Sequence, residues 1–267
     1  MNNSNIQYDK KFDYILSIPL VLYLAVICIL VGCVFMVITR DSFMLVVKDP
    51  AILSAVKLSI FSSVISTLLA LVFAIPSGYV LSRYRFPGLS VLDTLLDLPI
   101  VLPPLVMGLS VLIFFNTRLG RFIDSSVLEF VYTWRGIILV QFVIGCAFAI
   151  RVIKAGFDSM DRRYEEVAMT LGANRWQTFT RVTIPGIRSS LVAGAVISWA
   201  RIFGLFGPIL LVAGTMRGRT EIMPTTIFLE VSIGRIEVAL VIGAFMILIS
   251  VIALVIFKRL GGKGYLW

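Results

Sequence analysis

The sequence predicts an all-α membrane protein, built as a polytopic bundle of six transmembrane helices. Three observations support this fold class. Apolar residues make up 59% of the 267 residues and charged residues only 15%, whereas soluble domains are about a quarter charged. The mean hydropathy is +0.99. Several uncharged runs also reach the roughly 20 helical residues that are needed to cross a bilayer core of about 30 Å.

The first three spans are expected in three uncharged runs. Residues 15–39 form the first, and because this run is too long for a signal peptide we interpret it as an uncleaved span. Residues 58–82 form the second, with the amine of Lys57 able to reach the membrane surface. Residues 98–117 form the third.

The other three spans are less regular. Residues 136–150 are short for a span, but aromatic and basic residues at both ends can anchor a slightly longer helix. Residues 189–216 are long enough although they contain Arg201, and residues 238–257 form the sixth span. An even number of spans places both termini on one side of the membrane.

The distribution of basic residues orients the chain. Fourteen of the 24 lysines and arginines lie near the two termini, in 83–85 and in 151–188, whereas eight lie in the loops of the opposite side. Because cytoplasmic segments carry the excess of lysine and arginine, both termini are predicted to be cytoplasmic. The net charge of +9 then follows from topology, and no nucleic-acid partner is expected. The sequence contains no repeat and no linker long enough to divide it, so residues 1–267 are expected to form one transmembrane domain, and the short outer loops indicate no extracytoplasmic binding domain.

The composition also argues against several functional classes. The chain contains no histidine, which removes the commonest metal ligand and proton shuttle. Cys28, Cys33 and Cys146 lie in apolar runs without a paired spacing, so we expect buried apolar side chains instead of a disulfide or metal site. The apolar runs hold no carboxylate, which disfavours both a membrane-embedded enzyme and an ion-coupled transporter. A scaffold without transport activity stays an alternative.

Residues 151–188 form the one large cytoplasmic segment, and about 158–186 are expected to fold as helix–glycine–helix. Asp161 can cap the first helix, and Glu165 and Glu166 suit the positive end of its dipole. Gly172 can end this helix in a left-handed conformation. Apolar residues at helical spacing give each helix one apolar face: Tyr164, Val167, Ala168 and Leu171 in the first, and Ala173, Trp176, Phe179 and Val182 in the second, which is expected to end at Pro185.

Two interpretations of this segment are open on physical grounds. It is either an amphipathic connector packed on its own bundle or a docking element for a soluble partner. The residues Glu166-x-Ala168-x-x-Leu171-Gly172, followed after nine residues by Val182-x-Ile184-Pro185, resemble the EAA motif of permease subunits of bacterial and archaeal ABC importers. Val167 stands where that motif usually has alanine.

In that family the motif forms coupling helices, which fit a cleft on the cytoplasmic ATPase subunit. The resemblance therefore favours the docking interpretation. It implies that seven residues serve in coupling to the ATPase: Glu165, Glu166, Ala168, Leu171, Gly172, Arg175 and Pro185.

The resemblance extends to two spans. Residues 97–104 (DLPIVLPP) with Gly108 resemble the third span of the molybdate/tungstate/sulfate branch of this family, and residues 198–201 (SWAR) with Phe206-Gly207 resemble its fifth. Residues 217–224 resemble the outer loop that follows. Leu205 stands where the branch usually has an acid, which leaves the exact substrate open.

Two interrupted spans are expected to line the translocation path. Proline removes a helical donor and glycine weakens a helix, and irregular backbone at membrane depth survives where it lines a cavity or is buried in protein. The residues concerned are Pro99, Pro103 and Pro104 in the third span and Gly204, Gly207 and Pro208 in the fifth. Kinks that serve packing alone are the alternative.

Arg201 is the charged residue that lies well inside an apolar span, and such a residue is a functional candidate by default. Its guanidinium fork suits a tetrahedral oxyanion. The alternative is a structural arginine that hydrogen-bonds carbonyl groups freed by the break at 204–208 or that lies near the inner surface of the membrane.

The resemblance implies a permease subunit and not an enzyme. Two copies would form a homodimer in the inner membrane, with two cytoplasmic ATPase subunits and an extracytoplasmic substrate-binding protein as partners. ATP and Mg would then bind the ATPase, and this subunit would hold no cofactor. The implied substrate is a tetrahedral oxyanion, molybdate or tungstate ahead of sulfate, with another anion, a metal complex or a polyamine as the alternative.

Overall fold

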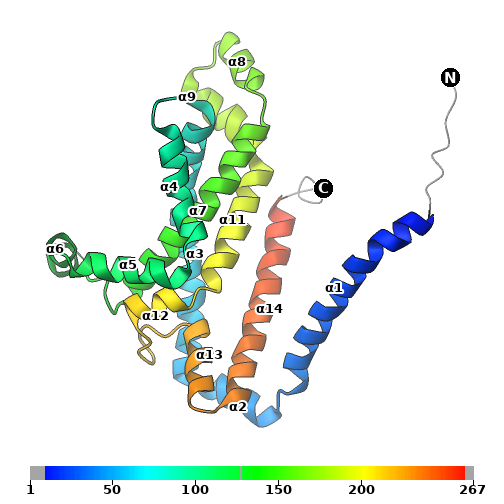
Figure 1. Cartoon of the computed structure of the whole chain (residues 1–267), viewed down its shortest axis with the longest axis vertical. Coiled ribbons are helices and arrows are strands. Elements are labelled where there is room, and N and C mark those ends of the chain that lie inside the picture. Colours follow the sequence, from blue (N-terminus) through cyan, green and yellow to red (C-terminus); the bar gives the residue numbers. More distant parts are fainter. Residues whose placement is uncertain (1–9, 127, 262–267) are drawn as a thin grey trace.

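The computed structural model describes residues 10–126 and 128–261, and within them the chain is helical and contains no β-strand (Figure 1). Four helices are long and apolar enough to cross a membrane. They are α1 (Lys10–Met36), α3 (Pro50–Arg83), α7 (Trp134–Ser159) and α14 (Ile236–Gly261).

Two bent helix pairs bring the number of candidate spans to six. The helices α4 (Leu89–Val101) and α5 (Pro104–Asn116) meet at 109°, and the helical segment Arg175–Gly186 meets α11 (Arg188–Phe203) at 69°. The predicted all-α membrane bundle is therefore confirmed, and the number of spans reaches the predicted six when each bent pair is counted as one span. Shorter helices outside the central polar segment are α2 (Arg40–Lys48), α6 (Arg118–Ser126), α12 (Gly207–Ala213) and α13 (Met223–Ser232).

The centre of the bundle is the contact between α3 and α7, on which α11 also packs. Small residues on one face of α3 allow the helices to approach closely: Ser59, Ser63, Ser66, Ala70, Ala74 and Gly78. Two hydrogen bonds pair polar side chains among these helices: Ser66 Oγ donates to Gln141 Oε1 at 3.1 Å, and Trp199 Nε1 donates to Ser63 Oγ at 3.2 Å.

The helix α1 lies apart from this centre, beside α14 (Figure 1). None of its most apolar 18-residue window is buried. The expectation that Cys28 and Cys33 are buried is therefore wrong: α14 contacts α1 but leaves both side chains exposed, whereas Cys146 in α7 is half-buried.

The third span begins earlier than predicted. Its first half α4 starts at Leu89 and not at residue 98, and it includes Asp93 and Asp97. Pro99 lies within α4 without ending it, and the break follows at Leu102 and Pro103, which are both extended. Each of these two residues precedes a proline, which disfavours the helical conformation there.

The fifth span is interrupted where the sequence predicts. The helix α11 ends at Phe203 and α12 begins at Gly207, so residues 204–206 form the break. The predicted end at residue 216 is wrong, because α12 ends at Ala213 and Gly214 follows with a φ of +68°. The fourth span α7 extends beyond 136–150 at both ends.

Candidate coupling and translocation sites

The polar central segment folds as a helical hairpin at one end of the molecule (Figure 1). The first helix is α8 (Arg163–Thr170), and the Asp161 carboxylate accepts a hydrogen bond from the N–H of Arg163 at 3.0 Å. Gly172 then adopts a φ of +92°, which favours glycine. The second helix begins with a capping box between Asn174 and Gln177, with hydrogen bonds of 2.8 and 2.9 Å.

The second helix ends next to Pro185, as predicted, with Gly186 as its last residue. The segment runs without a break through α9 (Arg175–Thr178), the π-helical η1 (Phe179–Thr183) and α10 (Ile184–Gly186), and the bend toward α11 comes at Ile187. Pro185 therefore lies inside this helical run, two residues before the bend.

The apolar face of this hairpin is not covered by the bundle. The exposed fractions are 65% for Tyr164, 58% for Val167, 83% for Leu171 and 71% for Trp176. Phe179 instead packs inward, with its ring centroid 5.0 Å from that of Tyr79. An amphipathic connector that packs on its own bundle would bury the first four side chains, so their exposure argues against that interpretation.

Glu165 anchors the hairpin to the end of α3. Its Oε1 pairs with Arg83 Nε at 3.1 Å and accepts from Thr183 Oγ1 at 3.2 Å, and its Oε2 accepts from the Tyr79 hydroxyl at 3.4 Å. Arg83 also donates to the carbonyl of Met160 at 3.2 Å. The two charged side chains are only 8% and 10% exposed.

The seven predicted coupling residues therefore divide into two kinds. Glu165 faces inward as an anchor, and Ala168 is half-buried. The others are exposed on the hairpin: Glu166, Leu171, Gly172, Arg175 and Pro185. Sequence patterns do not identify Arg83, Tyr79 and Thr183 as partners of Glu165, because these contacts form only when the hairpin folds against the end of α3.

The two interrupted spans meet at a pocket of about 300 Å³. Six of the seven predicted pathway residues line it together with Leu105, Leu205 and Phe206: Pro103, Pro104, Arg201, Gly204, Gly207 and Pro208. Pro99 does not. A Cβ atom on Gly108 would lie 2.5 Å from the Cα of Pro208, so α5 and α12 touch backbone to backbone beside the pocket.

Arg201 lies at the mouth of this pocket with its guanidinium 5.4 Å from the ring centroid of Phe148, a cation–π contact. Its side chain is exposed, and within the described residues it makes no hydrogen bond or ion pair. The structural alternative needs hydrogen bonds to carbonyl groups of the 204–208 break, which are not observed. The arrangement leaves the guanidinium fork available to an anion.

A second cluster of charges joins α4, the first half of the third span, to α7. Arg151 donates to the carboxylates of Asp93 and Asp97 and to the carbonyl of Asp93. The one indication of this cluster in the sequence is the pair Asp93 and Asp97, two acids one helical turn apart beside an apolar run.

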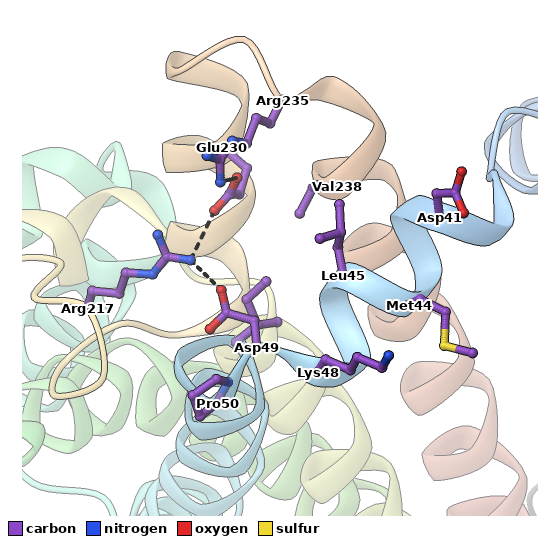
Figure 2. A pocket seen from close by; sticks show the side chains of 11 residues that line it. Asp41, Met44, Leu45, Lys48, Asp49, Pro50, Arg217, Glu230, Arg235 and Val238 are labelled. Atoms are coloured by element: carbon purple, nitrogen blue, oxygen red, sulfur yellow. Dashed lines mark hydrogen bonds and ion pairs between the residues drawn. The ribbon is translucent and has the colours of Figure 1, made fainter.

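At the end of the molecule opposite α8, a pocket of about 860 Å³ lies among α2, α3, α13 and α14. Figure 2 shows Arg217 reaching between two acids: its NH2 lies 2.6 Å from Asp49 Oδ2 and 3.7 Å from Glu230 Oε1. Arg235 NH1 lies 3.9 Å from Glu230 Oε2. Through Arg217, these ion pairs tie the loop before α13 to the start of α3 and to Glu230 in α13. Within the part of the chain that the structure describes, no group of three His, Cys, Asp or Glu is placed to hold a metal ion.

Comparison with known proteins gives a family match over residues 66–263, to the family described as "binding-protein-dependent transport system inner membrane component". Among curated proteins, the chain is 34% identical to the sulfate transport system permease protein CysT of Escherichia coli (strain K12), over 67% of this chain and 65% of that protein. It is 35% identical to the molybdate/tungstate transport system permease protein WtpB of Thermococcus kodakarensis, over 61% of each chain.

The matched part of this chain thus spans just under two thirds of the first curated relatives. Among solved structures, a chain of a bacterial ABC transporter involved in the import of the acidic polysaccharide alginate is similar with a TM-score of 0.76 over 94% of both chains. Its sequence identity is 19%, so this likeness concerns the fold alone.

Proposed function

The chain belongs to the family of binding-protein-dependent transport system inner membrane components, and from this premise we propose that it is the permease subunit of an ATP-driven importer of a tetrahedral oxyanion. Curated relatives at 34–35% identity are sulfate and molybdate/tungstate permeases, which is the branch that the third-span and fifth-span residues resemble.

The observation that carries the proposal is the exposed apolar face of the hairpin. Four large apolar side chains stand out at one end of the molecule on a hairpin whose base is fixed by the buried Arg83–Glu165 pair. Exposed apolar patches of this kind mark protein–protein contacts. A cleft on a cytoplasmic ATPase subunit would cover this face, and the rigid base would pass a movement of the hairpin to α3 and α7.

The substrate class rests on the pocket between the interrupted spans. The pocket holds one cation, Arg201, and its lining contains no carboxylate. A guanidinium at such a position favours a tetrahedral oxyanion, which it can bind with two parallel hydrogen bonds. We propose molybdate or tungstate ahead of sulfate. Another small solute, such as a different anion, a metal complex or a polyamine, is the second candidate because Leu205 replaces the acid expected there.

The proposed assembly contains two copies of this chain, each folded as one transmembrane domain, two ATPase subunits and an extracytoplasmic binding protein. ATP and Mg are bound by the ATPase, and this subunit carries no catalytic residue. ATP-driven closure of the ATPase dimer brings the two hairpins together and opens the path outward, and hydrolysis resets it. Both termini and the hairpin face the cytoplasm.

A pair of glycine substitutions tests the docking. Gly172 (φ +92°) and Gly234 (φ +81°) both adopt a left-handed conformation, and a Cβ atom added at either would meet nothing within 4 Å. We expect Gly172→Val to reduce co-purification of the ATPase, because it redirects the second helix of the hairpin, while Gly234→Val in the outer loop keeps it. Normal ATPase recovery with Gly172→Val would show that the hairpin is not the docking element.

Uptake and labelling test the remaining parts. Proteoliposomes with the ATPase and the binding protein should take up molybdate or tungstate in an ATP-dependent way, and uptake of sulfate alone or of none of the three would reject the ranking or the substrate class. Cysteines at Asn174 and Arg219 should react with an impermeant thiol reagent from opposite sides of sealed vesicles. Labelling of both from one side would contradict the proposed orientation.

A further inference from the structure

The inner half of the third span, α4, is held loosely by its neighbours. None of its residues is buried, and its main contact within the described chain is with α7. Leu89 and Leu96 pack at the edge of the α3–α7 core, whereas most other apolar side chains of α4 are exposed. The position of α4 therefore depends on few contacts.

A single arginine on α7 supplies the strongest of these contacts. All three guanidinium nitrogens of Arg151 are used: Nε and NH2 bind the two carboxylate oxygens of Asp97, NH1 donates to Asp93 Oδ1 at 2.8 Å, and NH2 also donates to the Asp93 carbonyl at 2.7 Å. A bidentate pair of this kind fixes orientation as well as distance. Without the arginine, the two acids would repel each other one helical turn apart.

The contact between Arg151 and α4 joins two helices that lead to different sites, the pocket of Arg201 and the hairpin. The helix α4 continues through the extended residues 102 and 103 into α5, which is packed tightly on α12 beside the pocket of Arg201. The C-terminal end of α7 leads, within a few residues, into α8, the first helix of the hairpin. Arg151 is therefore the link between the helix that carries the hairpin and the helix that leads to the pocket.

We propose that Arg151 is a positioning residue that couples movement of the hairpin to α4, so that α4 acts as the inner gate of the path and follows α7 through the ion pair with Asp93 and Asp97. This inference rests on the proposed function and adds to it a named residue through which the hairpin controls the gate. The extended break at 102–103 is the hinge that lets α4 move while α5 stays against α12.

Cysteine labelling measures the movement of α4 without requiring a known substrate. Leu96→Cys on the α7-facing side of α4 is the reporter, in the complex with the ATPase and without native cysteines (Cys28, Cys33 and Cys146 replaced by serine). Its rate of reaction with a thiol reagent should differ between the nucleotide-free and the vanadate-trapped complex. The difference should vanish in the variant Arg151→Met/Asp93→Asn/Asp97→Asn, which removes the ion pair without leaving an unpaired charge, while the ATPase still co-purifies and hydrolyses ATP.

Further measurements separate coupling from a merely structural role. Molybdate uptake per ATP hydrolysed should fall roughly two- to thirtyfold, the range by which residues between two sites alter their coupling. Arg151→Lys, which keeps the charge and loses the fork, should show a smaller loss and serves if the triple variant is not recovered. Val91→Cys on the exposed face of α4 is the control reporter for reagent access.

The outcomes are distinguishable. If the labelling difference persists in the variants, or is absent in the complex with the native Arg151, the coupling role is refuted. If the variants only lower yield and melting temperature, with the labelling difference intact, Arg151 is structural and the inference is wrong. If no ATPase co-purifies with the unsubstituted chain, the proposed function itself fails, and this inference fails with it.

Discussion

Replacing Glu165 by alanine should detach the hairpin from the bundle while the bundle itself stays folded. The substitution leaves the Arg83 guanidinium buried without its carboxylate, and the hydroxyls of Thr183 and Tyr79 lose their acceptor. Removing one partner of a buried ion pair costs about 3–5 kcal/mol. We expect the lower end, about 3 kcal/mol, because Arg83 keeps its hydrogen bond to the Met160 carbonyl. The population of detached hairpin should then rise roughly 150-fold.

Hydrogen exchange followed by mass spectrometry of the protein in nanodiscs is the suitable assay. Peptides covering the hairpin should exchange roughly 150-fold faster, and peptides from the middle of α3 and α7 should not change. The neighbouring Glu166→Ala is the matched control, since the Glu166 side chain is exposed and makes no hydrogen bond or ion pair in the described structure. Equal exchange in the two variants would refute the anchoring argument.

A paired replacement separates the charge from the packing. In Arg83→Met/Glu165→Met both charges are removed, and replacement of a buried ion pair by apolar residues of similar size is often neutral. Most of the protection lost in Glu165→Ala should return. If the double variant exchanges as fast as Glu165→Ala, the apolar contacts and hydroxyl hydrogen bonds matter more than the buried charge.

Three further predictions concern the rest of the molecule. Gly108→Ala should push α5 away from Pro208 at a cost of about 1–3 kcal/mol, seen as a lower melting temperature, whereas Gly243→Ala, with nothing within 4 Å of the added Cβ, should not lower it. Arg201→Gln should reduce molybdate uptake more than Arg201→Lys, with melting temperatures unchanged, and normal uptake in Arg201→Gln would remove this residue from the pathway. Burial raises the pKa of the Glu221 carboxyl, so the folded state binds this proton more tightly than the unfolded state. Stability should therefore fall as the pH rises from the ordinary carboxyl pKa through the raised one, and Glu221→Gln should flatten that part of the pH profile of unfolding.

The local features of the fold could be predicted from the sequence, because hydropathy, proline and glycine act within a few residues. They identify six spans, the interruptions at Pro103–Pro104 and at residues 204–208, and the turn at Gly172. The predicted start of the third span is wrong for a physical reason that is not local. The carboxylates of Asp93 and Asp97 are neutralised by an arginine more than 50 residues away, so they lie on the helix instead of ending it.

The same limit applies to the candidate sites. Sequence patterns predicted which residues of the hairpin are polar, apolar or flexible, but not that Glu165 faces Arg83 across 82 residues of chain. Sequence patterns also predicted six residues that line one pocket, although these residues lie in two separate spans. Each interruption could be predicted because prolines and glycines within that span cause it. That the two breaks meet follows from the packing of α5 on α12, and no single-sequence pattern contains that contact.

The isolated position of α1 has a consequence for biosynthesis. Its one substantial contact within the described chain is with α14, so the first span meets its only sizeable partner when the last span has been made. About 200 residues separate the two, and at roughly 5–20 residues per second the ribosome needs on the order of 10–40 s to add them. During that time α1 is inserted in the bilayer without its partner on the same polypeptide. Association with lipid, with the insertion machinery or with a neighbouring nascent chain can therefore precede the closing of the bundle.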